Sequence, residues 1–193
     1  MDGIFLDIET NGLNFLRHVP LEIAFKIIDL KTGVIKCSFE SMIAPSIEEW
    51  KRSDKESLAI NKIRFKALEN TKSREVIGEE IALKFNHHQV KRGKSVYICQ
   101  NPSFDRYFFS LLIDPDLQEK YHWPYHWLDL ASMQWALSMR DQNCPWLAGL
   151  TKDKIAAFHN LPSEKYPHRA MNGVEHLILC YEKAIGFRAG GAT

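Results

Sequence analysis

The sequence has few cysteines and no long apolar run. No stretch of its 193 residues approaches the run of about 18 apolar residues that a membrane-spanning helix needs. Its four cysteines, Cys37, Cys99, Cys144 and Cys180, include no CxxC pair, so we expect neither a zinc site nor a disulfide framework. The first residues, MDGIFLDIET, lack the basic segment of a signal peptide. We therefore expect a cytoplasmic protein in a reducing compartment, with no membrane partner.

A strong net charge is also missing. The formal net charge of +1 shows no global basic signature of a nucleic-acid-binding protein. Local binding is still compatible with this value, because affinity depends on the phosphates that are contacted. Twelve Lys or Arg residues lie between Lys51 and Lys94, with acidic residues interleaved. A solvated helical face is the plainer interpretation of this stretch, and a basic flank beside a cleft is the functional alternative.

Short apolar runs separated by turn signals predict an α/β fold. Strands are expected at 3–8, 21–29 and 34–43, and their short connections require antiparallel pairing. A fourth strand is expected at 95–99 and an irregular one within 121–127. Helices are expected from about residue 53, from about residue 73, and at 103–113, 128–140, 151–160 and 174–185. Together these elements predict one domain over 1–193, a mixed sheet with helices on both faces and a flexible tail from Gly186.

Two acidic residues end the first expected strand. Asp7 and Glu9 are two residues apart, so on a strand both side chains point to the same face. Two desolvated carboxylates on one face are unfavourable unless a cation neutralises them. Mg²⁺ or Mn²⁺, which prefer oxygen ligands, would suit this pair. On spacing alone, two solvated acids at a strand end are the more common interpretation.

Three segments that lie far apart in the sequence favour the metal-site interpretation instead. The segment Asp7-Ile8-Glu9-Thr10-Asn11-Gly12-Leu13 resembles the first motif of the DEDD 3'→5' exonucleases, D-x-E-T-x-G-L. The segment 97–108, with Asn101 and then Phe104-Asp105 opening a helix, resembles their second motif, and Asp129 is similar to an acid often found on their fifth strand. The sequence His168-Arg169-Ala170-Met171 resembles the start of the third motif. The resemblance runs through nearly the whole chain in the family's order.

The resemblance implies a fold and a mechanism. The fold would be the RNase H-like α/β fold of this superfamily, and the histidine in the third motif places the chain with the DEDDh subgroup. Two divalent ions, Mg²⁺ or Mn²⁺, would stabilise the attacking and leaving oxygens of phosphodiester hydrolysis. Asp7, Glu9 and Asp105 would bind metal, and His168 would be the general base. Taken singly, Asp105 is also typical of a first helical turn, and His168 of a solvated loop.

The same resemblance suggests how a substrate is held. Thr10, Gly12 and Leu13 of the first motif, with Asn101 and Phe104 of the second, would bind the terminal nucleotides. Leu13 matches the apolar wedge of the family, which suits single-stranded or frayed 3' ends of RNA or DNA. Phe15 and Phe104 offer stacking surface, with ordinary core packing as the alternative. Arg17, His18 and Arg169 are candidates for phosphate contacts.

The third motif departs from the family pattern. Its fourth acid normally stands five residues after the histidine, where this sequence has Gly173. Glu175 would replace that acid as a metal ligand if the last helix began after Gly173. Alternatively, Asn172 would act as a neutral ligand, or the site would work with fewer protein ligands. A third alternative is a weakened or inactive exonuclease that still binds nucleic-acid ends.

The function expected from the sequence is a metal-dependent 3'→5' exonuclease. A catalytically silent nucleic-acid-binding module is the alternative, because of Gly173. The aromatic cluster of Trp123, Tyr125, Trp127 and Trp135 predicts either core packing or a homodimer surface. RNA and DNA are not distinguished by these residues, since one or two local contacts decide the recognition of a 2'-hydroxyl.

Overall fold

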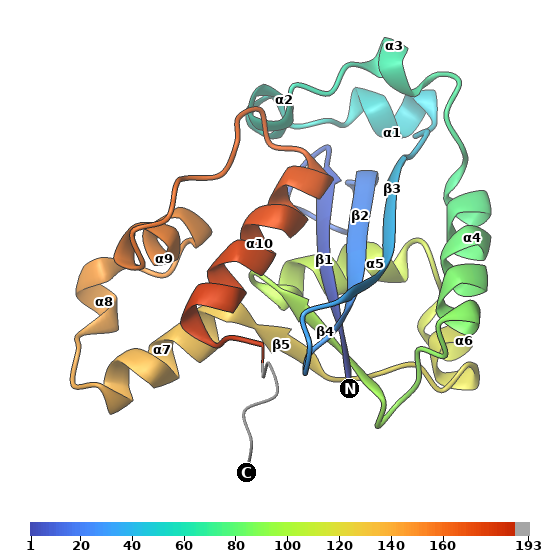
Figure 1. The fold of residues 1–193 in the computed structure, drawn as a ribbon. Helices are drawn as coiled ribbons and strands as arrows, with labels where there is room; N and C mark the ends of the chain where they lie inside the picture. Colours follow the sequence, from blue (N-terminus) through green and yellow to red (C-terminus); the bar gives the residue numbers. More distant parts are fainter. Residues whose placement is uncertain (188–193) are drawn as a thin grey trace.

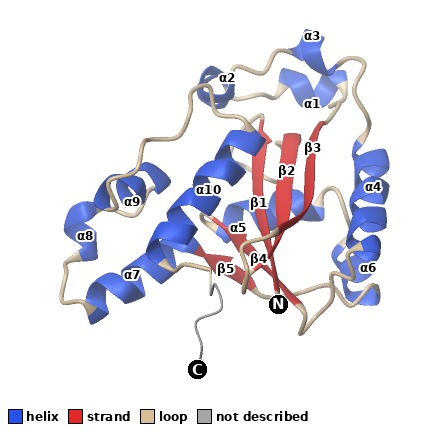
Figure 2. Ribbon diagram, viewed as in Figure 1, coloured by secondary structure: helices blue, strands red, loops and turns tan. Residues whose placement is uncertain are grey.

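The structure, a computed structural model, describes residues 1–187. A five-stranded mixed sheet lies at its centre, in the order β3-β2-β1-β4-β5 (Figure 2). The strands are β1 (Asp2–Thr10), β2 (Pro20–Asp29), β3 (Ile35–Met42), β4 (Ser95–Cys99) and β5 (Trp127–Asp129). The first three pair antiparallel, and β4 and β5 pair parallel to β1 and to each other. The predicted mixed sheet with three antiparallel strands first is confirmed.

Ten helices surround this sheet within residues 1–187 (Figure 1). The first seven are α1 (Ile47–Lys51), α2 (Lys55–Asn61), α3 (Phe65–Leu68), α4 (Arg74–His87), α5 (Pro102–Ser110), α6 (Pro115–Lys120) and α7 (Leu130–Arg140). The last three are α8 (Pro145–Ala148), α9 (Lys152–Phe158) and α10 (Ala170–Ala184). None of the described helices is long and apolar enough to cross a bilayer.

Both faces of the sheet are covered, because side chains alternate along each strand. Ile4, Leu6 and Ile8 of β1 pack with α4 and α5 in one apolar cluster. Phe5 packs on the opposite face with α7, α9 and α10 in a second cluster. Asp7 and Glu9 have the same parity as Phe5, so they continue the α10-facing row to the carboxyl end of β1. The central strand thereby brings its two acids next to the last helix.

Local capping explains where several helices begin. Ser73 accepts from the Val76 amide and starts α4, as the sequence predicted. A capping box formed by Ser46 and Glu49 starts α1, ahead of the helix expected from about residue 53. Asp54 caps α2 by accepting from the Glu56 amide.

The structure also bears on the expected last helix, aromatic cluster and tail. The last helix begins at Ala170 rather than at 174, so Gly173 lies inside it. Trp123 is buried and Trp127 stacks on Tyr97, whereas Trp135 is partly exposed beside Trp146. The expected flexible tail falls mostly on 188–193, outside the described residues.

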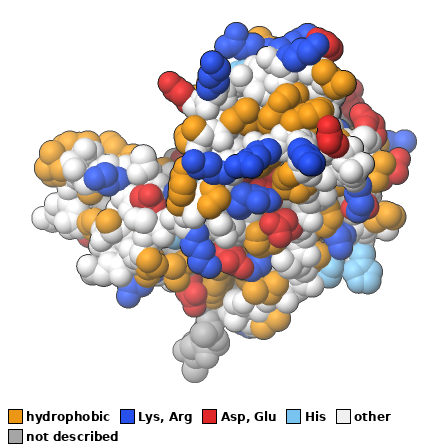
Figure 3. All heavy atoms as spheres, turned by 90° about the horizontal axis from the view of Figure 1, so that it is seen from above, with side chains coloured by type: hydrophobic (Ala, Val, Ile, Leu, Met, Phe, Trp, Pro, Cys, Tyr) orange, Lys and Arg blue, Asp and Glu red, His pale blue; other side chains and the backbone are white. Residues whose placement is uncertain are grey.

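The basic stretch between Lys51 and Lys94 is a mixed, solvated surface. Lys51 pairs with Glu48, Lys72 with Glu80, and Arg74 with Glu49. The view from above, onto the end that carries α1 to α3, shows Lys and Arg side chains with acidic and apolar ones among them (Figure 3).

Candidate active site

A cleft of about 200 Å³ opens at the carboxyl end of β1. Its walls come from β1 and the turn after it, from α2, α5 and α9, and from the segment that precedes α10. The lining includes most of the residues predicted for catalysis and substrate binding: Asp7, Glu9, Thr10, Leu13, Phe104, Asp105 and His168. The fold thus brings residues from all three motifs into one place.

Three carboxylates of this cleft are desolvated together. Burial raises the pKa of Asp7, with Lys152 acting in the opposite direction. Burial, and then the nearby Asp7 and Glu164, raise the pKa of Glu9 to about 8. Burial and the charge of Asp7 raise the pKa of Asp105 well above its usual range. Raised pKa values of this kind mark a site where negative charge is concentrated and insufficiently neutralised.

Two residues of the cleft were not predicted from the sequence. Lys152 of α9 places Nζ 2.8 Å from Glu164 Oε2 and 3.5 Å from Asp7 Oδ1. The Glu164 side chain is 3% exposed, and its backbone amide donates to Asp153 Oδ1 at 2.8 Å, which fixes the loop to α9. Neither residue lies in a recognisable motif, since one is in an ordinary amphipathic helix and the other in a proline-flanked loop. Only the tertiary fold places them beside Asp7.

His168 lies at the rim of the cleft. Its Nδ1 is 3.8 Å from Glu164 Oε1, and that buried oxygen has no hydrogen-bond partner. Its backbone amide donates to the Ile60 carbonyl at 3.4 Å, which joins the segment before α10 to α2. A histidine and an unpaired carboxylate oxygen therefore face each other next to the three acids.

Gly173 packs directly against Asp7. A Cβ built on Gly173 would overlap Asp7 Oδ2, so no side chain fits there without displacing that carboxylate. Glu175 lies elsewhere: it pairs with Lys26 at 2.8 Å and lines a different pocket together with Asn172. The reason is the early start of α10, because two residues along a helix turn the side chain by about 200°. The structure does not bring Glu175 or Asn172 to the cleft.

The residues predicted to bind substrate divide into two groups. Leu13 is 72% exposed at the mouth of the cleft, and Phe104 and Thr10 line it. Gly12 and Asn101 do not line it. Gly12 is buried where a Cβ would overlap the His18 ring, and Asn101 adopts a left-handed backbone before α5.

Two of the proposed phosphate contacts have structural partners instead. His18 is buried, and its Nδ1 accepts from the Asn14 amide at 2.9 Å. Arg169 pairs with the fully buried Glu22, its Nε donating to Glu22 Oε2 at 2.8 Å. These side chains organise the first turn and the start of α10.

Asp129 has a structural role in the described contacts. Its carboxylate accepts from the amides of Ala131, Ser132 and Asn101. It thereby caps α7 and ties that helix to the turn before α5. Asp129, which the sequence analysis compared with an acid of the family's fifth strand, is thus hydrogen-bonded to backbone amides.

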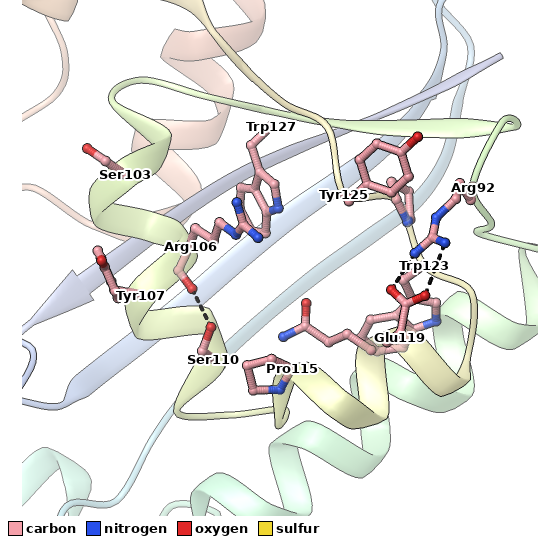
Figure 4. A pocket seen from close by; sticks show the side chains of 12 residues that line it. Arg92, Ser103, Arg106, Tyr107, Ser110, Pro115, Glu119, Trp123, Tyr125 and Trp127 are labelled. Atoms are coloured by element: carbon pink, nitrogen blue, oxygen red, sulfur yellow. Dashed lines mark hydrogen bonds and ion pairs between the residues drawn. The ribbon is translucent and has the colours of Figure 1, made fainter.

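A larger pocket, of about 510 Å³, lies on the other side of α5 (Figure 4). Its walls are aromatic, from Tyr107, Trp123, Tyr125 and Trp127, and Arg106 lines it as well (Figure 4). Arg92 donates to both carboxylate oxygens of Glu119 at its edge. Ser103, Arg106 and Tyr107 face this pocket, while Phe104 and Asp105 face the cleft, so the helix separates the two spaces.

In sequence comparisons, no protein-family model and no curated protein matches the chain. Solved structures with a similar fold do exist. Cell-death related nuclease 4 (CRN-4) has a TM-score of 0.73 at 15% identity, covering 97% of this chain and 65% of its own. The zinc-bound complex of E. coli exonuclease I with single-stranded DNA has a TM-score of 0.73 at 16% identity, covering 97% of this chain and 40% of its own.

A third similar structure has nearly the same extent as this chain. The nuclease domain of 3'hExo, a DEDDh family member solved with rAMP, has a TM-score of 0.69 at 10% identity, covering 100% of this chain and 96% of its own. The chain spans less than two thirds of the CRN-4 and exonuclease I chains. At these identities the likeness concerns the fold, and it confirms the RNase H-like fold of the exonucleases for this protein.

Proposed function

We propose that this protein is a metal-dependent 3'→5' exonuclease that acts on single-stranded RNA or DNA. The observation that carries the proposal is the meeting of Asp7, Glu9, Asp105 and His168 in one cleft, from three motifs far apart in the sequence. The fold shared with 3'→5' exonucleases supports it.

The donor set of the cleft fits a hard divalent cation such as Mg²⁺ or Mn²⁺. Asp7, Glu9 and Asp105 offer oxygen ligands, and a cation would offset the burial and the mutual repulsion that raise their pKa values. Within residues 1–187, no three such side chains are already grouped closely enough to hold an ion. Movement of these side chains would therefore accompany binding. A bound cation would stabilise the charge that develops on the phosphodiester oxygens.

His168 is suited to take a proton from the attacking water. Histidine can accept a proton near neutral pH. Glu164 Oε1, 3.8 Å from Nδ1, would hold the Nδ1 proton after a small ring rotation and leave Nε2 free as the acceptor. The exposed Leu13 at the mouth of the cleft would pack against the last base, which suits a free 3' end.

An assay on 5'- and 3'-labelled single-stranded RNA and DNA, in Mg²⁺, Mn²⁺ or EDTA, tests the proposal. The wild type should shorten strands stepwise from the 3' end, and EDTA, Asp7→Asn or His168→Ala should abolish this. Asp2→Asn is the matched control, because Asp2 is an acid at the opposite end of the same strand. A wild type that binds the oligonucleotides but releases nothing in either metal would overturn catalysis and leave a nucleic-acid-binding module.

A further inference from the structure

We propose that the Lys152 ammonium takes the place of one of the two divalent cations implied by the family resemblance, so that the centre binds a single divalent cation. The inference deepens the proposed function and rests on it. It makes the ion pair between Lys152 and Glu164 a permanent part of the metal-binding centre.

The position of Lys152 Nζ is the first observation. Three oxygens surround it: Glu164 Oε2 at 2.8 Å, the Gly173 carbonyl at 3.4 Å and Asp7 Oδ1 at 3.5 Å. They come from the loop before α10, from α10 and from β1. The Lys152 side chain is 12% exposed. An ammonium enclosed by oxygens from three segments occupies the kind of position that a bound cation would take.

Gly173 supplies the second observation. The residue that should carry the fourth carboxylate has no side chain, its α-carbon packs on Asp7, and its carbonyl oxygen lies beside Lys152. A carboxylate at 173 would need the space that Asp7 now fills. The missing acid at 173 and the Lys152 ammonium therefore lie at a single place in the centre.

The charges of the centre favour one added cation. Glu164 adds a further carboxylate to the cleft, but Lys152 neutralises it directly. Three carboxylates remain for metal, those of Asp7, Glu9 and Asp105. The Lys152 ammonium is held between two carboxylates, with Nζ 2.8 Å from Glu164 Oε2 and 3.5 Å from Asp7 Oδ1. A second divalent ion would meet this fixed positive charge at close range.

Lys152 acts as a positioning residue in this arrangement. Its three N–H donors are matched by the three protein oxygens around Nζ. It would hold Asp7 and Glu164 in place while the single divalent cation binds the remaining carboxylate oxygens. Glu164 in turn keeps its second oxygen for His168.

Counting bound Mn²⁺ without substrate tests the inference separately from activity. Free Mn²⁺ would be followed by electron paramagnetic resonance during titration of the metal-free wild type, Lys152→Met, Lys152→Arg and the exposed control Lys154→Met. We expect one Mn²⁺ per chain for the wild type, Lys154→Met and Lys152→Arg. Lys152→Met should bind two, because Glu164 is then free to act as a ligand.

The wild-type count decides the matter even if Lys152→Met fails to fold. Two bound ions, or none, in the wild type would overturn the inference, as would a folded Lys152→Met that still binds one. A wild type that binds two ions and shortens oligonucleotides would refute this inference and leave the proposed exonuclease standing. One bound ion without any nuclease activity would refute the proposed function instead.

Discussion

Gly173 has an unusual position for a glycine in a helix. Replacing a helical glycine with alanine normally stabilises the helix by about 1 kcal/mol. Here the added Cβ would overlap Asp7 Oδ2. The conformational gain and the steric cost therefore oppose each other at one carbon atom.

We predict that Gly173→Ala lowers the free energy of unfolding by about 1–3 kcal/mol, the usual cost of overpacking a tight site. It should also weaken Mn²⁺ binding, because Asp7 must move. Urea denaturation and metal titration measure the two effects. Asn172→Ala, one residue earlier in the same helix, should change neither by much. Unchanged stability and metal affinity in Gly173→Ala would show that Asp7 can move without cost.

Glu164 and Glu175 offer a direct comparison of two acids near the third motif. The Glu164 side chain is buried beside Lys152, whereas Glu175 is about half exposed and pairs with Lys26 outside the cleft. Glu164→Gln should lower exonuclease activity about 10- to 100-fold, as is typical when a group that orients a metal centre is removed. Glu175→Gln should leave activity within about twofold, because Glu175 does not line the cleft. A larger loss of activity in Glu175→Gln than in Glu164→Gln would indicate that Glu175 acts as the fourth acid.

At the scale of the element, α10 is tied to the sheet by a buried carboxylate. Glu22 of β2 is fully buried and accepts from Arg169 and from the Ala170 amide, the first of the helix. The negative charge also lies at the positive end of the helix dipole. This contact sets the start of α10 at Ala170, and with it the side of the helix that Glu175 occupies.

We predict that Arg169→Met lowers the free energy of unfolding by about 3–5 kcal/mol, because it leaves Glu22 buried and unpaired. The double variant Arg169→Met with Glu22→Met should recover much of that loss. Arg74→Met, which breaks the half-buried pair with Glu49, should cost about 1 kcal/mol or less. Equal losses for the two arginine variants in urea denaturation would contradict this account of α10.

For the whole molecule, the acid cluster makes stability depend on pH. The pKa of Glu9 is about 8 in the folded protein against 4.5 ordinarily, and the pKa values of Asp7 and Asp105 are also raised. Between pH 4.5 and about pH 8, the Glu9 carboxyl has lost its proton in the unfolded chain but keeps it in the folded protein. The free energy of unfolding must therefore fall as pH rises through this window.

We predict that the metal-free protein in EDTA loses stability on the order of 1–3 kcal/mol between pH 5 and about pH 8. Glu9→Gln should flatten this slope, and Mg²⁺ at pH 8 should restore stability by binding the folded state. Urea denaturation across the pH range measures both. A free energy of unfolding that stays constant or rises toward pH 8 would show that these acids are not desolvated as described.

Much of the architecture was predictable because local patterns carried it. The strands around Asp7 and at 95–99 followed from apolar runs and turns, and the three motifs marked Asp7, Glu9, Asp105 and His168. Lys152 and Glu164 were not predictable, because each enters the cleft only through the packing of α9 and its following loop. Glu175 was misplaced because the contact between Glu22 and Ala170, which starts α10 early, joins residues 148 positions apart.

The order of the site residues along the chain has a consequence for protein synthesis. Asp7 and Glu9 emerge first, on the central strand, whereas Lys152, Glu164 and His168 come from the last segments to be added. Any growing chain that ends before residue 168 lacks His168 and the helix that packs against Asp7. On the proposed function, the chain would therefore have no nuclease activity during its synthesis and would gain it only after α10 packs against β1.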